Sequence, residues 1–413
     1  MLRASLCLVL VFAASAGADV DLFAIAESMG YNPTRIFTQP TEMLLPGDMV
    51  LLSEGVYQSD YALSVANTNG TAQNPIVFAA MPGHQVILDG QSASLEARDC
   101  SHIIFDGLTL ANSQNNLGQG ARLTSSNNIT LRNIDSSGHT YGVWGMQDLH
   151  DVVIENCVFH HNSSSGVNLG ASSISNSDIT IRDCLIYNNG GDGIQHVGAI
   201  AGLSVDNNVI HSNAGAGISL LEGVCDSLIE ANLVFNNSRH GILLRNEGSQ
   251  YVPAGAQEGN TFIDNIIWIG LHAWNGQSPS PADKIAIMFE DLAGTGLTNN
   301  SFQDNILVTY SGALVAFSSD QQTVENSFVA NTLFRYCGPG VIYTVEGASF
   351  VLDDLNSLAH SGMNTFGWPG FDDVSLEYYN TPERFNFGMP EPSAAACLLL
   401  CSGMLSVLRR RRR

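Results

Sequence analysis

The chain has 413 residues, of which 45% are hydrophobic and 13% are charged, so it can bury an extensive apolar interior and is not disordered by composition. Its formal charge of −23, from 39 acidic and 16 basic residues, gives a surface that repels nucleic acid. No basic stripe overrides this charge, so we exclude nucleic-acid binding from the expected functions.

The first 18 residues have the pattern of a secretory signal peptide. Arg3 gives a short positive start, and an apolar run from Leu6 to Ala14 leads into small residues. This order is typical of export signals, with cleavage near Ala16 or Ala18. A buried first helix is the alternative, but the apolar run is short. We therefore expect residues 1–18 to be removed during Sec-type export.

An internal repeat decides the fold class. Gly-Val and Gly-Ile pairs recur at spacings of 24, 27, 24 and 24 residues: Gly142-Val143, Gly166-Val167, Gly193-Ile194, Gly217-Ile218 and Gly241-Ile242. Each interval also holds two further apolar segments, which are separated by turns rich in Asn. Strands that stack at about 4.8 Å put equivalent residues in columns. The sequence therefore predicts an all-β, single-domain right-handed parallel β-helix with three short strands per coil.

The columns predict which side chains face the interior. Two columns are apolar and should form the core: Val167, Ile194, Ile218 and Ile242, and Phe159, Ile186, Ile210 and Val234. Asn208 and Asn232 predict two steps of an internal amide ladder. Cys157 and Cys184 occupy the same column in earlier coils. Stacked cysteines could approach disulfide distance, but we expect two packed thiols.

Two outward columns have a structural and a functional interpretation. The first column alternates in charge and predicts cross-coil ion pairs of little energetic weight: Glu155, Arg182, Asp206, Glu230 and Asp264. The second column is aromatic: His160, Tyr187, His211, Phe235 and Trp268. Stacked rings stabilise neighbouring strands, and an exposed aromatic strip is also a surface on which sugar rings stack.

Two insertions interrupt the later coils. The gap from Ile229 to its expected equivalent Ile263 is 34 residues, and the gap from Ile263 to Phe302 is 39. The extra residues fall at 247–259 and 270–283. Insertions of a solenoid map to loops on one side, often the binding side.

Candidate catalytic residues lie beside these insertions. Glu222, Arg245 and Glu247 should converge after one strand of successive coils, where paired carboxylates could serve acid/base chemistry or hold Ca²⁺. A solvated, mixed-charge surface is the alternative. Lys284 is the only lysine of the chain, and we expect it to be a solvated loop residue.

The C-terminus carries a second signal. Pro390, Glu391 and Pro392 precede an apolar segment over residues 394–408, and five arginines end the chain. In order and spacing, residues 389–413 resemble the PEP-CTERM sorting signal of Gram-negative bacteria. The resemblance implies an exosortase-type membrane enzyme as a partner, with the segment held transiently in the inner membrane. A retained membrane anchor is the alternative, although about 15 apolar residues fall short of a comfortable span.

The β-helix domain should then occupy residues 19–388. We expect an N-terminal cap and first coils over 19–100, regular coils over 101–335, and a C-terminal cap over 336–388. The segments Leu45-Pro46-Gly47-Asp48 and Ile87-Leu88-Asp89-Gly90 are similar to the opening coils of pectate-lyase-like proteins. That resemblance, over residues 36–335, implies the fold and a carbohydrate context.

The resemblance assigns few catalytic residues to this chain. Polygalacturonase-type hydrolases of this fold have Asn-Thr-Asp, Gly-His-Gly and Arg-Ile-Lys blocks, and none occurs here. Lyases of this fold use Arg or Lys as a base, commonly with calcium, which points only to Arg245 or Lys284. We therefore expect an exported surface or extracellular-matrix protein that binds polysaccharide or acts as a rigid scaffold. The alternative is a calcium-dependent lyase that acts on uronate-containing glycans.

Overall fold

A computed structural model describes most of the chain. The described residues are 21–39, 43–112, 118–170, 176–247, 257–270, 284–294, 296–309, 313–318, 326–335, 343–345, 348–350 and 364–366. Both predicted signals and most of the predicted C-terminal cap lie outside these ranges. No helix within the ranges is both long enough and apolar enough to cross a membrane.

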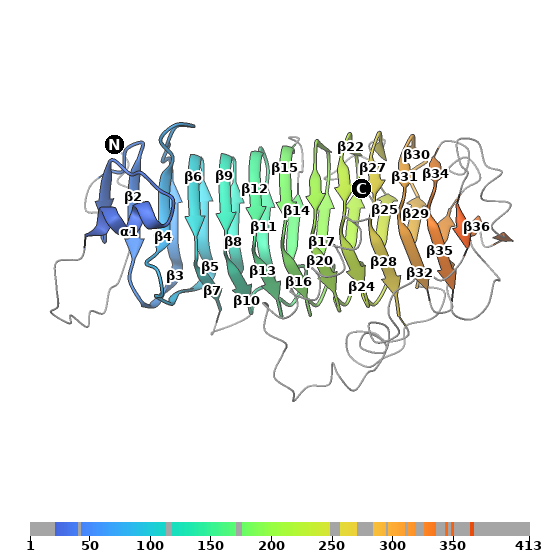
Figure 1. The fold of residues 1–413 in the computed structure, drawn as a ribbon, viewed down its shortest axis with the longest axis horizontal. Helices are drawn as coiled ribbons and strands as arrows, with labels where there is room; N and C mark the ends of the chain where they lie inside the picture. Colours follow the sequence, from blue (N-terminus) through green and yellow to red (C-terminus); the bar gives the residue numbers. More distant parts are fainter. Residues whose placement is uncertain are drawn as a thin grey trace, which may run out of the picture.

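The fold is a single right-handed parallel β-solenoid, as predicted, and its coils follow one another along the long axis in Figure 1. Each regular coil contributes one strand to each of three faces. Face A is one continuous parallel sheet of β1 (Arg35–Phe37), β2 (Asp48–Leu52), β4 (Ile76–Ala80), β6 (Ser101–Asp106), β9 (Asn127–Arg132), β12 (His150–Glu155), β15 (Asn176–Arg182), β19 (Ser204–Asp206), β23 (Leu228–Glu230), β27 (Thr261–Ile263), β31 (Ser301–Gln303) and β34 (Ser327–Val329).

Faces B and C come from the second and third strands of each coil. Face B comprises β7 (Thr109–Ala111), β10 (Asp135–Ser137), β13 (Val158–His160), β16 (Leu185–Tyr187), β20 (Val209–His211), β24 (Leu233–Phe235), β28 (Ile266–Ile269), β32 (Ile306–Thr309), β35 (Thr332–Arg335) and β38 (Thr365–Phe366). Face C comprises β8 (Gln119–Thr124), β11 (Tyr141–Met146), β14 (Val167–Gly170), β17 (Ile194–Val197), β21 (Ile218–Leu221), β25 (Ile242–Asn246), β29 (Ile287–Asp291), β33 (Val315–Phe317) and β36 (Tyr343–Val345).

The remaining strands are long or peripheral. In the first coils, β3 (Gly55–Ala66) pairs with β5 (Val86–Arg98), and β5 in turn pairs with both β7 and β8, so these long strands pass from face B to face C. Short pairs extend the corners between faces C and A: β18 (Ile200–Ala201) with β22 (Val224–Cys225), and β26 (Gln257–Glu258) with β30 (Leu297–Thr298). One antiparallel strand, β37 (Ala348–Phe350), follows β36.

The register confirms the predicted core columns but corrects one alignment. Ile229 pairs with Phe262, and Glu230 pairs with Ile263, so the expected equivalence of Ile229 and Ile263 was wrong by one residue. Because both Phe262 and Ile263 are apolar, alternation could not fix the phase across the insertion. Asp264 therefore leaves the charge column and occupies a corner with φ of 56°.

Amide ladders run along the corners of the solenoid. The Oδ1 atom of Asn232 accepts hydrogen bonds from the backbone N–H and the side-chain Nδ2 of Asn208, both at 3.0 Å. The predicted step is thus confirmed, and the same pattern continues through Asn265, Asn305, Asn331 and Asn364. A second ladder, at the corner of faces B and C, comprises Asn162, Asn189, Asn213 and Asn237. These bonds satisfy buried polar groups that the turns would otherwise leave unpaired.

Two cysteines extend the first ladder toward the N-terminus. Cys157 and Cys184 are buried free thiols, as we expected. The Sγ atom of Cys184 lies 3.7 Å from the carbonyl of Ile154, and that of Cys157 lies 3.5 Å from the carbonyl of Leu131. The thiols thus point at the backbone carbonyls of the preceding coil, as the ladder amides do.

The N-terminal helix packs on the outside of face A. α1 (Leu22–Ser28) begins at Asp21, whose Oδ1 accepts hydrogen bonds from two backbone N–H groups of the first turn. Its buried Ala26 joins an apolar cluster with Met49 and Leu51 of β2 and Val77 of β4. Figure 1 shows α1 crossing this end of the solenoid. The exterior of face A is therefore covered over its first strands and open beyond them.

The glycine column at the start of face C reflects close packing. A Cβ atom at Gly193 would lie 2.4 Å from Cγ2 of Ile210 and 2.6 Å from the carbonyl oxygen of Gly217. Equivalent contacts occur at Gly166 and Gly217. The column therefore lets consecutive coils approach at a corner where a side chain would not fit.

Gly193→Ala should destabilise the solenoid by about 1–3 kcal/mol, the usual cost of overpacking. The matched control is Gly170→Ala on the same face, because no atom lies closer than 3.9 Å to its added Cβ. Thermal unfolding followed by circular dichroism measures both variants. Equal midpoints for the two would contradict the steric explanation.

Two fully buried histidines make stability depend on pH. Burial lowers the pKa of both His139 and His196 to about 4. The Nε2 atom of His139 lies 2.9 Å from Oγ of Ser94, and that of His196 lies 2.9 Å from the carbonyl of Gly198. The folded state therefore keeps both rings neutral at a pH where the unfolded chain takes up protons.

We expect stability to fall as the pH drops from about 6.5 to about 4, because the unfolded state binds more protons over that window. His139→Asn, which copies the adjacent ladder residue Asn162, should reduce the slope of melting temperature against pH. His84→Asn, at an exposed ring, serves as the control. An unchanged slope in His139→Asn would refute the assignment.

Candidate functional site

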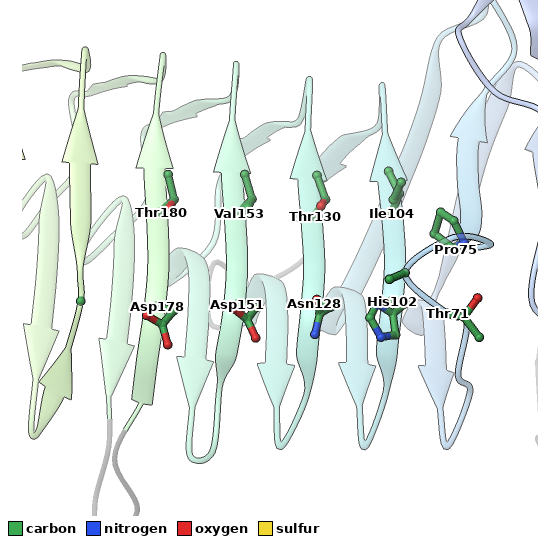
Figure 2. Close-up of a pocket in the computed structure, with 12 residues that line it drawn as sticks. Thr71, Pro75, His102, Ile104, Asn128, Thr130, Asp151, Val153, Asp178 and Thr180 are labelled. Atoms are coloured by element: carbon green, nitrogen blue, oxygen red, sulfur yellow. The ribbon is translucent and has the colours of Figure 1, made fainter.

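A groove runs across the open exterior of face A. Its volume is about 520 Å³, and its walls span successive coils from β6 to β15, with the segment before β4 at one end. Figure 2 shows two parallel rows of side chains that project from these strands. One row is polar: His102, Asn128, Asp151 and Asp178. The other row is mixed: Ile104, Thr130, Val153 and Thr180. Thr71 and Pro75 lie at one end in Figure 2, and Ala72 also lines the groove. The register places Gly202 beside Asp178 in the next coil.

Backbone geometry aims the polar row outward. His102, Asn128, Asp151 and Asp178 have φ between 52° and 55°, in the left-handed region. The strand pairing skips these positions, so that His150 pairs with Ser177 and Val152 with Ile179. The register is the same on both sides of each position, so the left-handed residue recurs in every one of these coils and no strand carries an unmatched residue. Asn and Asp tolerate this conformation better than most residues, which explains their recurrence.

Sequence reasoning missed this row. Its signal was the recurrence of Asn128, Asp151, Asp178 and Gly202 at spacings of 23, 27 and 24 residues, which follows the coil repeat. Alternation of apolar residues does not reveal this row, because the left-handed residue interrupts the alternation within each strand. A search for Asn, Asp and Gly within strands at the coil period would have found the row.

A charged network borders the groove near α1. Oδ2 of Asp106 accepts hydrogen bonds from the hydroxyl of Tyr31 at 2.7 Å and from Arg132 at 2.8 Å. Burial alone would raise the pKa of Asp106, but hydrogen bonds from Arg132, Tyr31 and Asn133 outweigh it and lower that pKa. Burial, followed by the bond to Asp106, raises the pKa of Tyr31. Each group therefore has a partner in the network, which holds the loop after α1 against the sheet.

The predicted acid/base residues come together in part. Glu222 Oε1 accepts a hydrogen bond from the backbone N–H of Glu247 at 2.9 Å. Arg245 lies 3.4 Å from Glu247 and 3.1 Å from Glu290, a residue that the sequence did not single out. Glu290 is the neighbour of Arg245 in the face C register. The guanidinium thus lies between two carboxylates, as in the mixed-charge surface that we kept as the alternative.

Lys284 lies apart from this cluster and differs from expectation. It precedes β29, whereas Glu290 lies near the far end of that strand. Its side chain is buried, and its Nζ donates a hydrogen bond to the carbonyl of Gly270 at 2.6 Å. Burial lowers the pKa of Lys284 to about 8. The expectation of a solvated lysine was therefore wrong.

Calcium remains a prediction from the sequence. Within the described ranges, no three His, Cys, Asp or Glu side chains are grouped so that they could share a metal ion. Glu222 and Glu247 meet through a backbone N–H rather than by facing carboxylates.

The aromatic column has the predicted register but not the predicted exposure. The rings of His160, Tyr187, His211 and Phe235 stack in turn, with centroids 5.1, 5.3 and 4.7 Å apart and interplanar angles of 9°, 11° and 14°. Trp268 follows Phe235 in the register. The ring faces between neighbours are therefore occupied by other rings and cannot stack on sugars.

Burial removes most of this column from the surface. His211, Phe235 and Trp268 are 7%, 4% and 5% exposed, and burial lowers the pKa of His211 to about 3. Phe235 and Trp268 belong to an apolar cluster on the exterior of face B with Leu185, Val209, Leu233, Ile266, Ile306 and Val308. Packing is thus the role of the later rings, and the expected exposed strip was wrong for them.

The comparisons with known proteins agree with this architecture. Residues 84–226 and 174–333 match the family described as a right-handed beta helix region, so the two overlapping matches run from residue 84 to residue 333. The chain belongs to this right-handed β-helix family. No curated protein matches the sequence.

Solved structures share the fold at low identity. A lacto-N-biosidase from Eubacterium ramulus is 15% identical with a TM-score of 0.55, over 79% of this chain and 63% of the biosidase. The A-module of a mannuronan C-5 epimerase from Azotobacter vinelandii is 16% identical with a TM-score of 0.48, over 84% of this chain and 93% of the module. This β-helix chain therefore spans less than two thirds of the biosidase, and the likeness shows the fold alone.

Proposed function

We propose that this β-helix protein binds a polysaccharide along the groove of face A. The observation that carries the proposal is the repetition of the groove, which presents a new set of polar groups on each coil. Hydroxyl, amide, carboxylate and imidazole groups are the partners that sugar hydroxyls need. Because coils stack at about 4.8 Å, these groups form a regular row. A repeating surface of this kind suits a repeating ligand.

Charge favours a neutral glycan over an acidic one. The chain has a formal charge of −23, and Asp151 and Asp178 add two carboxylates to the groove itself. A uronate polymer would meet repulsion here unless a cation bridged the two. The lacto-N-biosidase of similar fold bears the name of an enzyme that acts on a glycan, which supports a carbohydrate ligand in general.

Export and surface sorting complete the proposal. The signal peptide at residues 1–18 and the PEP-CTERM-type segment at 389–413 support secretion to the surface or matrix of a Gram-negative bacterium. Polysaccharides are abundant there, so the destination agrees with the ligand.

Mass spectrometry of the exported protein should find the terminal arginines removed if an exosortase-type enzyme processes it.

Removing the two groove carboxylates should weaken glycan binding. Asp151→Ala combined with Asp178→Ala removes hydrogen-bond acceptors, and a loss of about 1.4 kcal/mol lowers affinity tenfold. Affinity electrophoresis in gels that contain neutral or uronate-rich polysaccharides, with and without calcium, measures the change. Glu247→Ala is the control, because its exposed carboxylate lies beside Arg245 and outside the groove. Binding that survives the double substitution, or is lost with Glu247→Ala, would overturn the groove assignment.

A uronate lyase is the second candidate, and Lys284 favours it. Burial lowers the pKa of Lys284 to about 8, which favours the neutral amine, the form that can accept a proton. The same polysaccharide incubations test this function by the absorbance of unsaturated products. Products that depend on Lys284 and calcium would replace the binding role with lyase activity.

A further inference from the structure

A Ser–His–Asp arrangement lies at the rim of the face A groove. The Nδ1 atom of His150 lies 2.8 Å from Oγ of Ser177, and its Nε2 lies 2.9 Å from Oδ1 of Asp148. The two residues that follow His150 and Ser177, Asp151 and Asp178, line the groove in Figure 2. The three groups therefore adjoin the proposed binding surface.

The fold brings these groups together from two coils. His150 on β12 pairs with Ser177 on β15, so their side chains are neighbours in one outward column. Asp148 is not part of that column. It lies in the corner before β12 with φ of 55° and approaches the other ring nitrogen. Stacking within one column brings His150 beside Ser177, but it would not bring Asp148 to the imidazole ring.

The arrangement is accessible to solvent. The side chains of His150 and Asp148 are 39% and 49% exposed, and Ser177 is half-buried. If Nε2–H donates to Asp148, Nδ1 is the acceptor for the Ser177 hydroxyl proton. Both distances lie within the range that a nucleophile and its general base require.

We propose that Ser177, His150 and Asp148 form an esterase site that removes acyl groups from the bound glycan. The glycan part of this assignment rests on the proposed function, whereas the nucleophile does not. Recognition of such an arrangement depends on geometry and roles, not on order in the sequence.

The reaction balances with water as the only co-reactant. Ser177 Oγ attacks the acyl carbon while its proton moves to His150 Nδ1, and Asp148 stabilises the resulting imidazolium. Collapse of the tetrahedral intermediate expels the sugar oxygen, which takes the proton from His150. Water then attacks the acyl-serine, His150 accepts its proton and returns it to Ser177, and a carboxylic acid leaves.

The test uses the full chain with a fluorophosphonate probe and, separately, p-nitrophenyl acetate. Mass spectrometry should locate the probe on Ser177. His150→Asn should lower both the labelling rate and ester hydrolysis about a hundredfold, the usual contribution of a general base, and Asp148→Asn should lower them less. These surface substitutions leave the core untouched, and circular dichroism verifies folding.

Ser101→Ala is the matched control. Ser101 occupies the same outward column three coils before Ser177, but its Oγ donates to Asn69 rather than to a histidine. Labelling elsewhere than on Ser177, or labelling that His150→Asn leaves unchanged, would overturn the nucleophile. Neither assay contains a glycan, so its result is independent of groove binding. Activity on the small ester without acid release from an acylated neutral polysaccharide would overturn the glycan substrate alone.

Discussion

Every feature of this protein depends on the in-register stacking of one coil on the next. Backbone hydrogen bonds place each residue beside the equivalent residues of the coils before and after it. Each side chain must therefore pack or pair with the other members of its column. Val167, Ile194 and Ile218 satisfy this constraint as a core column. Asn208 and Asn232 satisfy it by hydrogen bonding to each other. The same spacing gives the groove its repeated polar row.

Stacking also determines which groups remain available for chemistry. Arg182 is paired with Glu155, Arg245 lies between two glutamates, and the rings from His160 to Phe235 cover one another. Side chains whose types suggest a function in the sequence are thus already held in ion pairs or ring stacks. The polar row of face A differs because its residues adopt a left-handed backbone conformation and project from the strands into the groove. Functional groups in a solenoid are therefore expected where a left-handed residue interrupts the alternation within a strand.

The fold could be predicted from the sequence because glycine and asparagine recur at the coil spacing. Local backbone geometry determines where these two residue types occur. Gly193 and Asn213 are fixed by contacts with the next coil, and equivalent residues recur at the coil spacing. The exposure of individual side chains could not be predicted in the same way. Trp268 and Lys284 are both buried, and alternation could not predict this because it separates inward from outward side chains without showing how far an outward side chain is exposed. The candidate site was missed because a left-handed residue in each strand interrupts the apolar alternation on which the prediction relied.

The corner ladders have a mechanical consequence. Force applied along the axis would be shared by the hydrogen bonds of each interface between coils, while successive interfaces carry it in series. The rod then yields at its weakest interface, whatever the strength of the others. From Asn208 onward the corner between faces A and B is bridged by amides, whereas Cys157 and Cys184 offer only weak thiol contacts. Leu108 and Ile134 hold the same position in the preceding coils, so tensile failure at this corner is directed to the coils that come before Asn208.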